Sequence, residues 1–152
     1  MKRRIHGIAG VTGFVVIAIF WTSTVVSELF GSEASIAAVK TNILWGMLIL
    51  IPALAVAGGS GMSLGRMRKG MLAARKKKRM PFIAMNGLLI LVPSAVFLAS
   101  RANQGVYDGW FYGVQAIELI AGAINLCLMG LNIRDGFRMS GRFRRSQPRH
   151  AA

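Results

Sequence analysis

The sequence predicts an all-α integral membrane protein whose four transmembrane helices pack as a bundle. Of its 152 residues, 54% are hydrophobic and only 16% are charged, whereas a soluble domain is about 45–50% apolar and about 25% charged. Four apolar stretches, at residues 7–30, 42–63, 81–100 and 109–133, are each long enough to cross a hydrocarbon core of about 30 Å. Lipid offers no partner for backbone polar groups, so each stretch must be helical. The alternation typical of transmembrane β-strands does not occur.

The distribution of basic residues predicts the orientation of these helices. Seventeen of the 19 lysines and arginines lie at the N-terminus, in the loop 64–80 and in the tail 134–152, which a four-span topology places on one side. Basic segments are retained in the cytoplasm. We therefore expect one membrane domain of two antiparallel hairpins, N-in and C-in, in a plasma membrane, specifically a bacterial inner membrane. This topology accounts for the net charge of +14 without nucleic acid.

The first span, residues 7–30, follows three basic residues at positions 2–4. A basic start before an apolar run also describes a secretory signal peptide, whose apolar region is typically about 7–15 residues long. This run is longer, so we expect it to remain as a span. The alternative is that residues 1–34 are cleaved off as a signal peptide, which would leave three spans.

Two charged residues border the first outer turn. Glu28 lies near the end of the first span, and Lys40 lies shortly before the second. We expect them to form an ion pair in the outer leaflet, where such exposed pairs are common and contribute little.

The second and third spans each contain a proline near mid-membrane, Pro52 and Pro93. Proline lacks an N–H and clashes with the carbonyl four residues earlier, so we expect a bend at both positions. A curved bundle and a small polar cavity between the bends are both consistent with this pattern. The small residues Ala53, Ala57, Gly61 and Gly65 also repeat at every fourth position, which predicts close approach of another helix.

The loop 64–80 between these spans carries a run of basic side chains. A lysine or arginine beside a membrane attracts anionic headgroups with about 1 kcal/mol, although topology alone also explains the run. We expect the protein to contact membrane lipids, with anionic headgroups at the cytoplasmic face. The candidate contacts are Arg75, Lys76, Lys77, Lys78 and Arg79.

Polar and small residues repeat at steps of three and four along the fourth span, which places them on one side of the helix. They are Gln115, Glu118, Gly122, Asn125, Met129 and Asn132. At about 1.5 Å per residue, Glu118 lies roughly 13 Å from the outer end of the span. An acidic side chain at this depth is expected to be neutral, paired or hydrated.

Two interpretations of Glu118 remain open. In the first, it hydrogen-bonds to Asn86, Asn125 or a partner subunit and keeps the helices in register. In the second, it carries a proton or contacts a ligand, with Gln115, Asn86 and Asn125 lining the route.

Catalytic and cofactor motifs are absent from the sequence. A single cysteine, Cys127, excludes a disulfide within the chain. Neither histidine lies within a span, so a bis-histidine haem is excluded within one chain, and His6 with Met85 or Met129 is the candidate ligand pair that remains. No zinc, phosphate-loop or catalytic-triad motif occurs. We expect no enzyme, no resident metal and no cofactor.

Two hypotheses of function follow. The first is a non-enzymatic membrane component, namely an accessory, assembly or scaffolding subunit or a self-associating bundle, with a homo-oligomer or a membrane complex as its partner. The alternative is a small oligomeric transporter or ion or proton pathway that uses Glu118.

Overall fold

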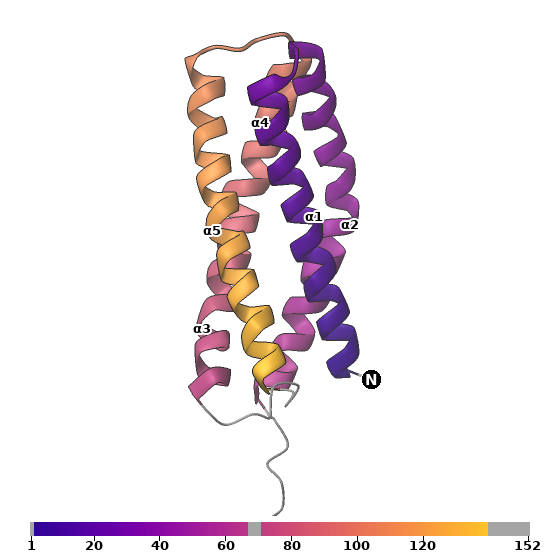
Figure 1. The fold of residues 1–152 in the computed structure, drawn as a ribbon, viewed down its shortest axis with the longest axis vertical. Helices are drawn as coiled ribbons and strands as arrows, with labels where there is room; N and C mark the ends of the chain where they lie inside the picture. The colour runs from indigo at the N-terminus through magenta and orange to yellow at the C-terminus, as the bar shows by residue number, and fades with distance from the viewer. Residues whose placement is uncertain (1, 67–70, 140–152) are drawn as a thin grey trace, which may run out of the picture.

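The computed structural model describes residues 2–66 and 71–139, and within them it contains helices and short connections but no strand. Figure 1 shows an elongated bundle of α1 (Lys2–Phe30), α2 (Glu33–Arg66) and α5 (Gly109–Met139), with α3 (Met71–Asn86), η1 (Gly87–Leu91) and α4 (Val92–Asn103) following one another beside them. Among the described residues, four stretches are long and apolar enough to cross a membrane: Arg4–Phe30, Glu33–Gly61, Lys78–Asn103 and Gly109–Arg138. The prediction of an all-helical chain with four helices of membrane-spanning length is confirmed.

The two ends of the bundle differ in composition. We call one the turn end, where α1 meets α2 and where residues 104–108 join α4 to α5. We call the other the basic end, where Arg4, Lys78 and Arg138 lie. The helices extend beyond the apolar stretches of the sequence toward both ends. In particular, α2 begins at Glu33, and Lys40 in its second turn is buried inside the bundle.

The turn between α1 and α2 depends on a glycine. The N–H of Gly31 donates to the carbonyl of Ser27 at 2.9 Å, and a Cβ on Gly31 would lie only 2.5 Å from that oxygen. A side chain therefore does not fit at this position. Directly afterwards, Oγ of Ser32 accepts the N–H of Ser35 at 3.3 Å, which satisfies a free donor at the start of α2.

The third membrane-crossing stretch changes its helical form near the middle. The N–H of Val92 donates to the carbonyl of Gly87, the spacing of a π-helix, and this segment directly precedes Pro93. Short π-helical turns occur inside α-helices where the regular hydrogen-bond pattern is disturbed, and Pro93 has no N–H to offer. In contrast, α2 continues as an α-helix through Pro52. The bends at the two prolines stay predictions.

The connection from α4 to α5 is held by polar contacts. Gly105 has φ +68°, a conformation that favours glycine. Oδ1 of Asp108 accepts the N–H of Phe111 at 2.9 Å and caps α5, while Oδ2 of the same residue pairs with Arg101 at 3.2 Å. The hydroxyl of Tyr107 donates to the carbonyl of Glu33 at 2.8 Å. Burial raises the pKa of Tyr107, and nearby acidic groups raise it further.

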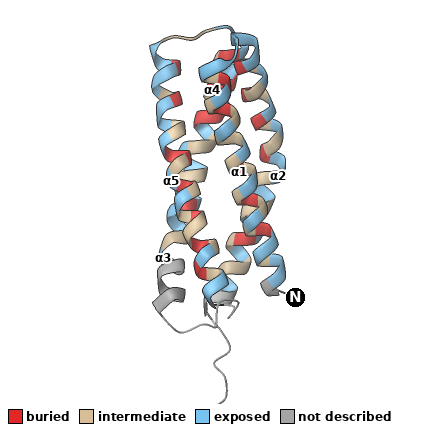
Figure 2. Cartoon of the chain, in the orientation of Figure 1, coloured by how far each residue is buried: buried red, intermediate tan, exposed pale blue. Residues whose placement is uncertain are grey.

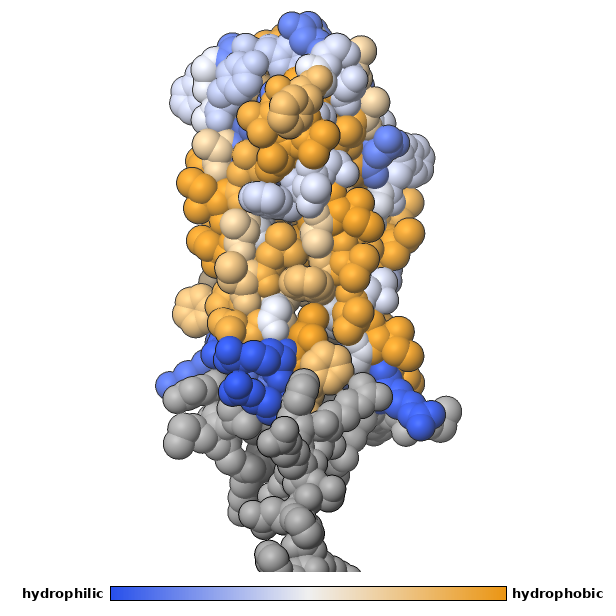
Figure 3. Space-filling view, in the orientation of Figure 1, coloured by the Kyte–Doolittle hydropathy of each residue, from blue (hydrophilic) through white to orange (hydrophobic). Residues whose placement is uncertain are grey.

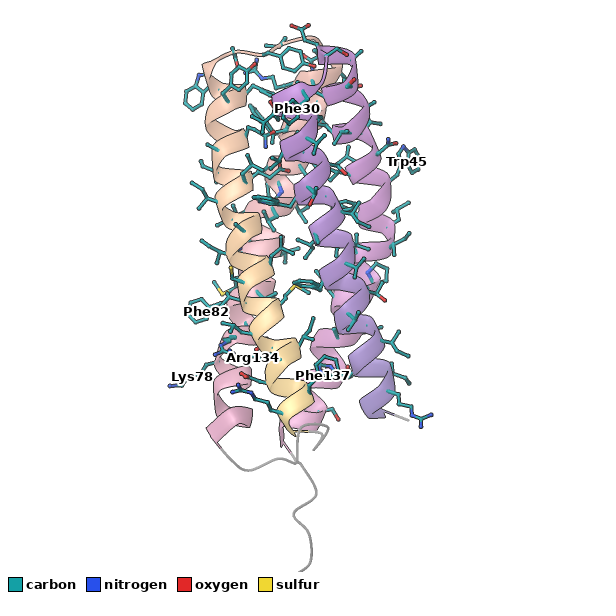
Figure 4. The ribbon with its side chains drawn as sticks, in the orientation of Figure 1. Phe30, Trp45, Lys78, Phe82, Arg134 and Phe137 are labelled. Atoms are coloured by element: carbon teal, nitrogen blue, oxygen red, sulfur yellow. The ribbon has the colours of Figure 1, made fainter. Side chains whose placement is uncertain are left out.

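Figure 2 marks the buried residues along the helices of the bundle, and the face seen in Figure 3 is mostly apolar over its middle, where many large hydrophobic residues are exposed. Three apolar clusters follow one another along the axis: Ile36, Leu98, Ala102 and Phe111; Ile43, Met47 and Ala95; and Ile17, Ile83 and Met129. Trp45 and Phe82 point away from the bundle in Figure 4. Because a broad hydrophobic band covers the middle of the molecule, its surface fits a lipid environment better than water.

Candidate functional site

The most conspicuous polar contact inside the bundle joins Lys40 of α2 to Glu118 of α5. Nζ of Lys40 donates to Oε2 of Glu118 at 2.6 Å; the Lys40 side chain is 0% exposed and that of Glu118 is 12% exposed. Nε2 of Gln115, one turn earlier on α5, donates to the same oxygen at 3.2 Å. Glu118 is therefore paired, which is one of the three states expected for an acidic side chain at this depth. Its partner is Lys40, which we expected to form an ion pair in the outer leaflet.

The structure differs from the predicted Glu28–Lys40 pair. The lysine forms its salt bridge with Glu118 instead, and Glu28 interacts electrostatically with both of these residues. Oε1 of Glu28 is buried and has no hydrogen-bond partner among the described residues. The cluster at this depth thus contains two acids and one lysine, contributed by α1, α2 and α5.

Asn86 and Asn125 form a second, separate polar group. Nδ2 of Asn86, at the end of α3, donates to Oδ1 of Asn125 at 2.9 Å and to the carbonyl of Ala121 at 2.8 Å. Nδ2 of Asn125 in turn donates to the carbonyl of Ile83 at 3.4 Å. The four predicted pathway residues therefore divide into two pairs, with Gln115 and Glu118 nearer the turn end.

A cavity of about 430 Å³ lies between these groups, and Glu118 and Asn125 both line it. Its other walls are mostly apolar and come from α1, α2, α4, α5 and the segment 83–91. Among the described residues, α2 packs against α3 and α4 but not against η1. Ile51 of α2 and Leu88 of η1 line the cavity and are also exposed. The cavity therefore reaches the surface of the bundle between α2 and η1.

The basic end holds an ion-pair group that the sequence analysis did not predict. Asp135 on α5 is 2% exposed, and its Oδ2 lies 2.8 Å from Nη1 of Arg79 while its Oδ1 lies 3.5 Å from Nη2 of Arg134. The pattern along the fourth span contained the signal, since a further step of three from Asn132 arrives at Asp135. Arg79, expected on lipid, is thus bound to a buried carboxylate.

The remaining lipid-contact candidates lie on α3. Lys78 is exposed and points outward at the basic end (Figure 4). Arg75, Lys76 and Lys77 have helical backbone, but their side chains lie outside the described residues. Contact of this run with lipid stays a prediction.

Part of the predicted small-residue stripe on α2 contacts other helices of the same chain. Nδ1 of His6 lies 3.0 Å from the carbonyl of Ala57, so this ring nitrogen is the donor. A Cβ on Gly61 would lie within 3.0 Å of both the His6 ring and Met80. These two positions of α2 therefore pack against α1 and α3. Gly65 lies outside the residues whose side-chain surroundings are described.

The candidate haem ligands are not equivalent in the structure. His6 and Met129 both line a second cavity near the basic end, whereas Met85 is exposed on the surface. Among the described residues, no group of three or more His, Cys, Asp or Glu side chains is placed to hold a metal ion.

The fold and these polar groups define a four-helix protein of membrane-spanning dimensions with a paired, buried lysine and glutamate. Comparison of the chain with protein-family models, with curated proteins and with solved structures gave no match.

Proposed function

We propose that this chain is a non-enzymatic integral membrane component, an accessory, assembly or scaffolding subunit or a self-associating bundle. The observation that carries the proposal is a second stripe on α2, formed by Ala55, Gly59 and Ser63, which are all exposed and spaced by four residues. A Cβ on Gly59 would meet nothing within 4 Å. Small residues at this spacing let another membrane helix approach closely. We call these three residues the open α2 stripe.

The polar groups inside the bundle support the same proposal. Glu118 bonds to Lys40 and Gln115, and Asn86 bonds to Asn125. Hydrogen bonds between side chains of different helices keep the helices in register and do not require a substrate, although Oε1 of Glu28 and Oε1 of Gln115 have no partner among the described residues. The interior contacts therefore suit a structural bundle, and the open α2 stripe is where it would meet a second copy or a larger membrane complex.

The proposal includes an orientation in the membrane. The basic end faces the cytoplasm, both termini lie on that side, and the four spans form two antiparallel hairpins with bends at Pro52 and Pro93. Basic residues at one end of the bundle support this arrangement. The membrane is the plasma membrane, a bacterial inner membrane, and anionic lipids contact the basic end.

Native mass measurement in mild detergent tests the association. The wild-type chain is expected as a dimer, a higher oligomer or a complex with another chain, and Gly59→Leu is expected to shift it to a monomer. Gly113→Leu is the matched control, because Gly113 is also exposed with nothing within 4 Å of its Cβ but lies on α5. A monomeric wild-type chain, or equal effects of the two substitutions, would contradict the proposal.

A second candidate function rests on one observation. Glu118 and Asn125 line the cavity between α2 and η1, as a small transporter or proton pathway would require. In that case Glu118→Gln abolishes proton-coupled flux into liposomes, while assembly is retained. Glu33→Gln, an exposed acid at the turn end, is the control. Unchanged flux in Glu118→Gln would eliminate this candidate.

A further inference from the structure

The second cavity lies toward the basic end and has a volume of about 670 Å³. This value falls within the range of about 300–1,000 Å³ that is typical of sites for small ligands. Its walls come from α1, α2, α3 and α5, and they are largely apolar, with Ile8, Leu54 and Met129 among the residues that line it. We call it the basic-end cavity.

One side of the basic-end cavity is left open by glycines. A Cβ on Gly7 or on Gly10 of α1 would meet nothing within 4 Å, and both residues line the cavity. Ile8 and Val11, between and beside them, are exposed. The cavity is therefore open toward the surface of the bundle along α1.

The polar residues of the cavity define the chemistry of its occupant. Arg4 lines it at the basic end, and no acidic side chain is among the described residues that do so. Asn132 also lines it, is only 8% exposed, and has an Oδ1 atom with no hydrogen-bond partner among the described residues. An occupant that fits carries a negative charge near Arg4, a polar linkage near Asn132 and an apolar chain beyond.

These positions follow the depth profile of a phospholipid. Arg4 to Val11 spans about 10 Å along α1 at about 1.5 Å per residue, and the polar side chains lie at the end that faces the headgroups. The free Oδ1 of Asn132 is an acceptor, so a bridging water that donates to both oxygens would link it to an ester linkage. Phe137 lies between the basic ends of α5 and α1 in Figure 4 and lines the same cavity. Leu54, Gly58, Ile83 and Ala84 line both cavities, so the apolar space continues toward Glu118.

We propose that the basic-end cavity binds one anionic phospholipid, with an acyl chain between the helices, the ester region at Asn132 and the phosphate at Arg4. This site is distinct from the basic run at 75–79 on α3, because no residue of that run is among the described residues that line the cavity. The described residues that line it include none of the open α2 stripe, so this proposal is tested separately from the proposed association.

Native mass spectrometry of the full chain with added lipid tests the site. Phosphatidylglycerol and phosphatidylcholine with the same acyl chains are compared in the same detergent. The wild-type chain is expected to retain one phosphatidylglycerol with roughly five-fold higher affinity than phosphatidylcholine, the effect of about one arginine near the membrane surface. Equal affinity for the two lipids would overturn the proposal.

Two kinds of substitution separate the headgroup from the chain. Arg4→Gln is expected to abolish the preference for phosphatidylglycerol while both lipids still bind. Gly10→Leu, with Gly7→Leu as a second variant, fills the open side and is expected to abolish binding of both lipids. Gly113→Leu is the control and retains wild-type binding, because Gly113 lines neither cavity. Retained lipid in both filled variants, or an unchanged preference in Arg4→Gln, contradicts the proposal.

An absorbance spectrum of the purified chain covers the competing occupant. His6 and Met129 line the same cavity, so a haem Soret band would assign the space to haem and overturn the lipid site. A stoichiometric second protein that is lost in Gly10→Leu would overturn it as well, because the cavity would then accept a protein segment. A featureless visible spectrum together with one bound lipid supports the proposal.

Discussion

Lys40 places a charged side chain in the interior of the bundle. It is fully buried, and its ammonium group contacts Glu118 at 2.6 Å. Removing both charges from water is costly, and the attraction between them offsets this cost only while both are present. Breaking such a pair is therefore much more destabilising than replacing both residues by neutral ones of similar shape.

A double-mutant cycle tests this dependence. Glu118→Gln leaves Lys40 without its anion, and Lys40→Met leaves Glu118 without its cation; each is expected to lower the free energy of unfolding by about 3–5 kcal/mol. The double variant is expected to recover most of the loss, because the two charges of the pair are removed together and Glu28, the acid that remains beside them, is only partly buried. Unfolding in mixed micelles measures all four proteins, and additive losses in the double variant would exclude a coupled pair.

Asp135 provides the corresponding test at the basic end. Asp135→Asn removes the charge that holds Arg79, and we expect a loss of about 1–3 kcal/mol, as for a buried hydrogen bond to a charged group. Asp108→Asn is the matched control, because that carboxylate is exposed and asparagine caps a helix equally well. Similar unfolding free energies for the two variants would mean that the Arg79–Asp135 contact contributes nothing measurable.

The polar residues of the fourth span were predictable individually, but their partners were not. The spacing of Gln115, Glu118 and Asn125 placed them on one side of a helix, and all three make interior hydrogen bonds. Which side chain reaches Glu118 depends on the relative axial shift of α2 and α5, a tertiary quantity that no local pattern encodes. Lys40 therefore appeared to belong to the outer turn, near Glu28, although it lies inside the bundle.

Among the helices, α1 and α5 are held together by a glycine and a tryptophan. A Cβ on Gly122 would lie 2.9 Å from Cδ1 of Trp21, and Nε1 of Trp21 donates to the carbonyl of Leu119 at 2.9 Å. The Nε1–Cδ1 edge of the indole thus contacts α5 where that helix has no side chain. A methyl group at this position would displace the ring and its hydrogen bond together.

Gly122→Ala is expected to destabilise the protein by about 1–3 kcal/mol, the usual cost of overpacking. Gly113→Ala is the control, since its Cβ meets nothing within 4 Å, and alanine there is expected to be neutral or stabilising by up to about 1 kcal/mol. Unfolding free energies of the two variants provide the comparison. Equal changes in the unfolding free energy of the two variants would mean that α1 and α5 can move apart around Gly122 to make room for a methyl group.

Helix existence followed from hydropathy, whereas helix limits and helical form did not. The apolar stretch 42–63 is shorter than α2, which begins at Glu33. The stretch begins only after the charged Lys40, but this lysine is paired with Glu118 inside the bundle. The segment Gly87–Leu91 resembles any other apolar run in sequence. Its π-helical form depends on hydrogen-bond partners one residue further along the chain, which hydropathy does not report.

Across the whole molecule, charge is distributed unevenly between the two ends. Arg4, Lys78 and Arg138 lie at the basic end, and the turn end carries Glu33, Arg101 and Asp108. This difference sets the orientation during membrane insertion, because basic segments are retained in the cytoplasm. The proposed lipid in the basic-end cavity and the proposed orientation therefore depend on the same asymmetry, since anionic lipids are concentrated in the cytoplasmic leaflet.

Cysteine labelling measures the orientation directly. Cys127 is replaced by alanine because it is exposed, and single cysteines are introduced as Gln104→Cys at the turn end and Arg138→Cys at the basic end, both exposed positions. A membrane-impermeant maleimide added to spheroplasts is expected to label Gln104→Cys and to label Arg138→Cys only after lysis. The Cys127→Ala background, which has no cysteine, reports non-specific labelling. Labelling of Arg138→Cys before lysis would reverse the orientation, and with it the leaflet from which the basic-end cavity takes its lipid.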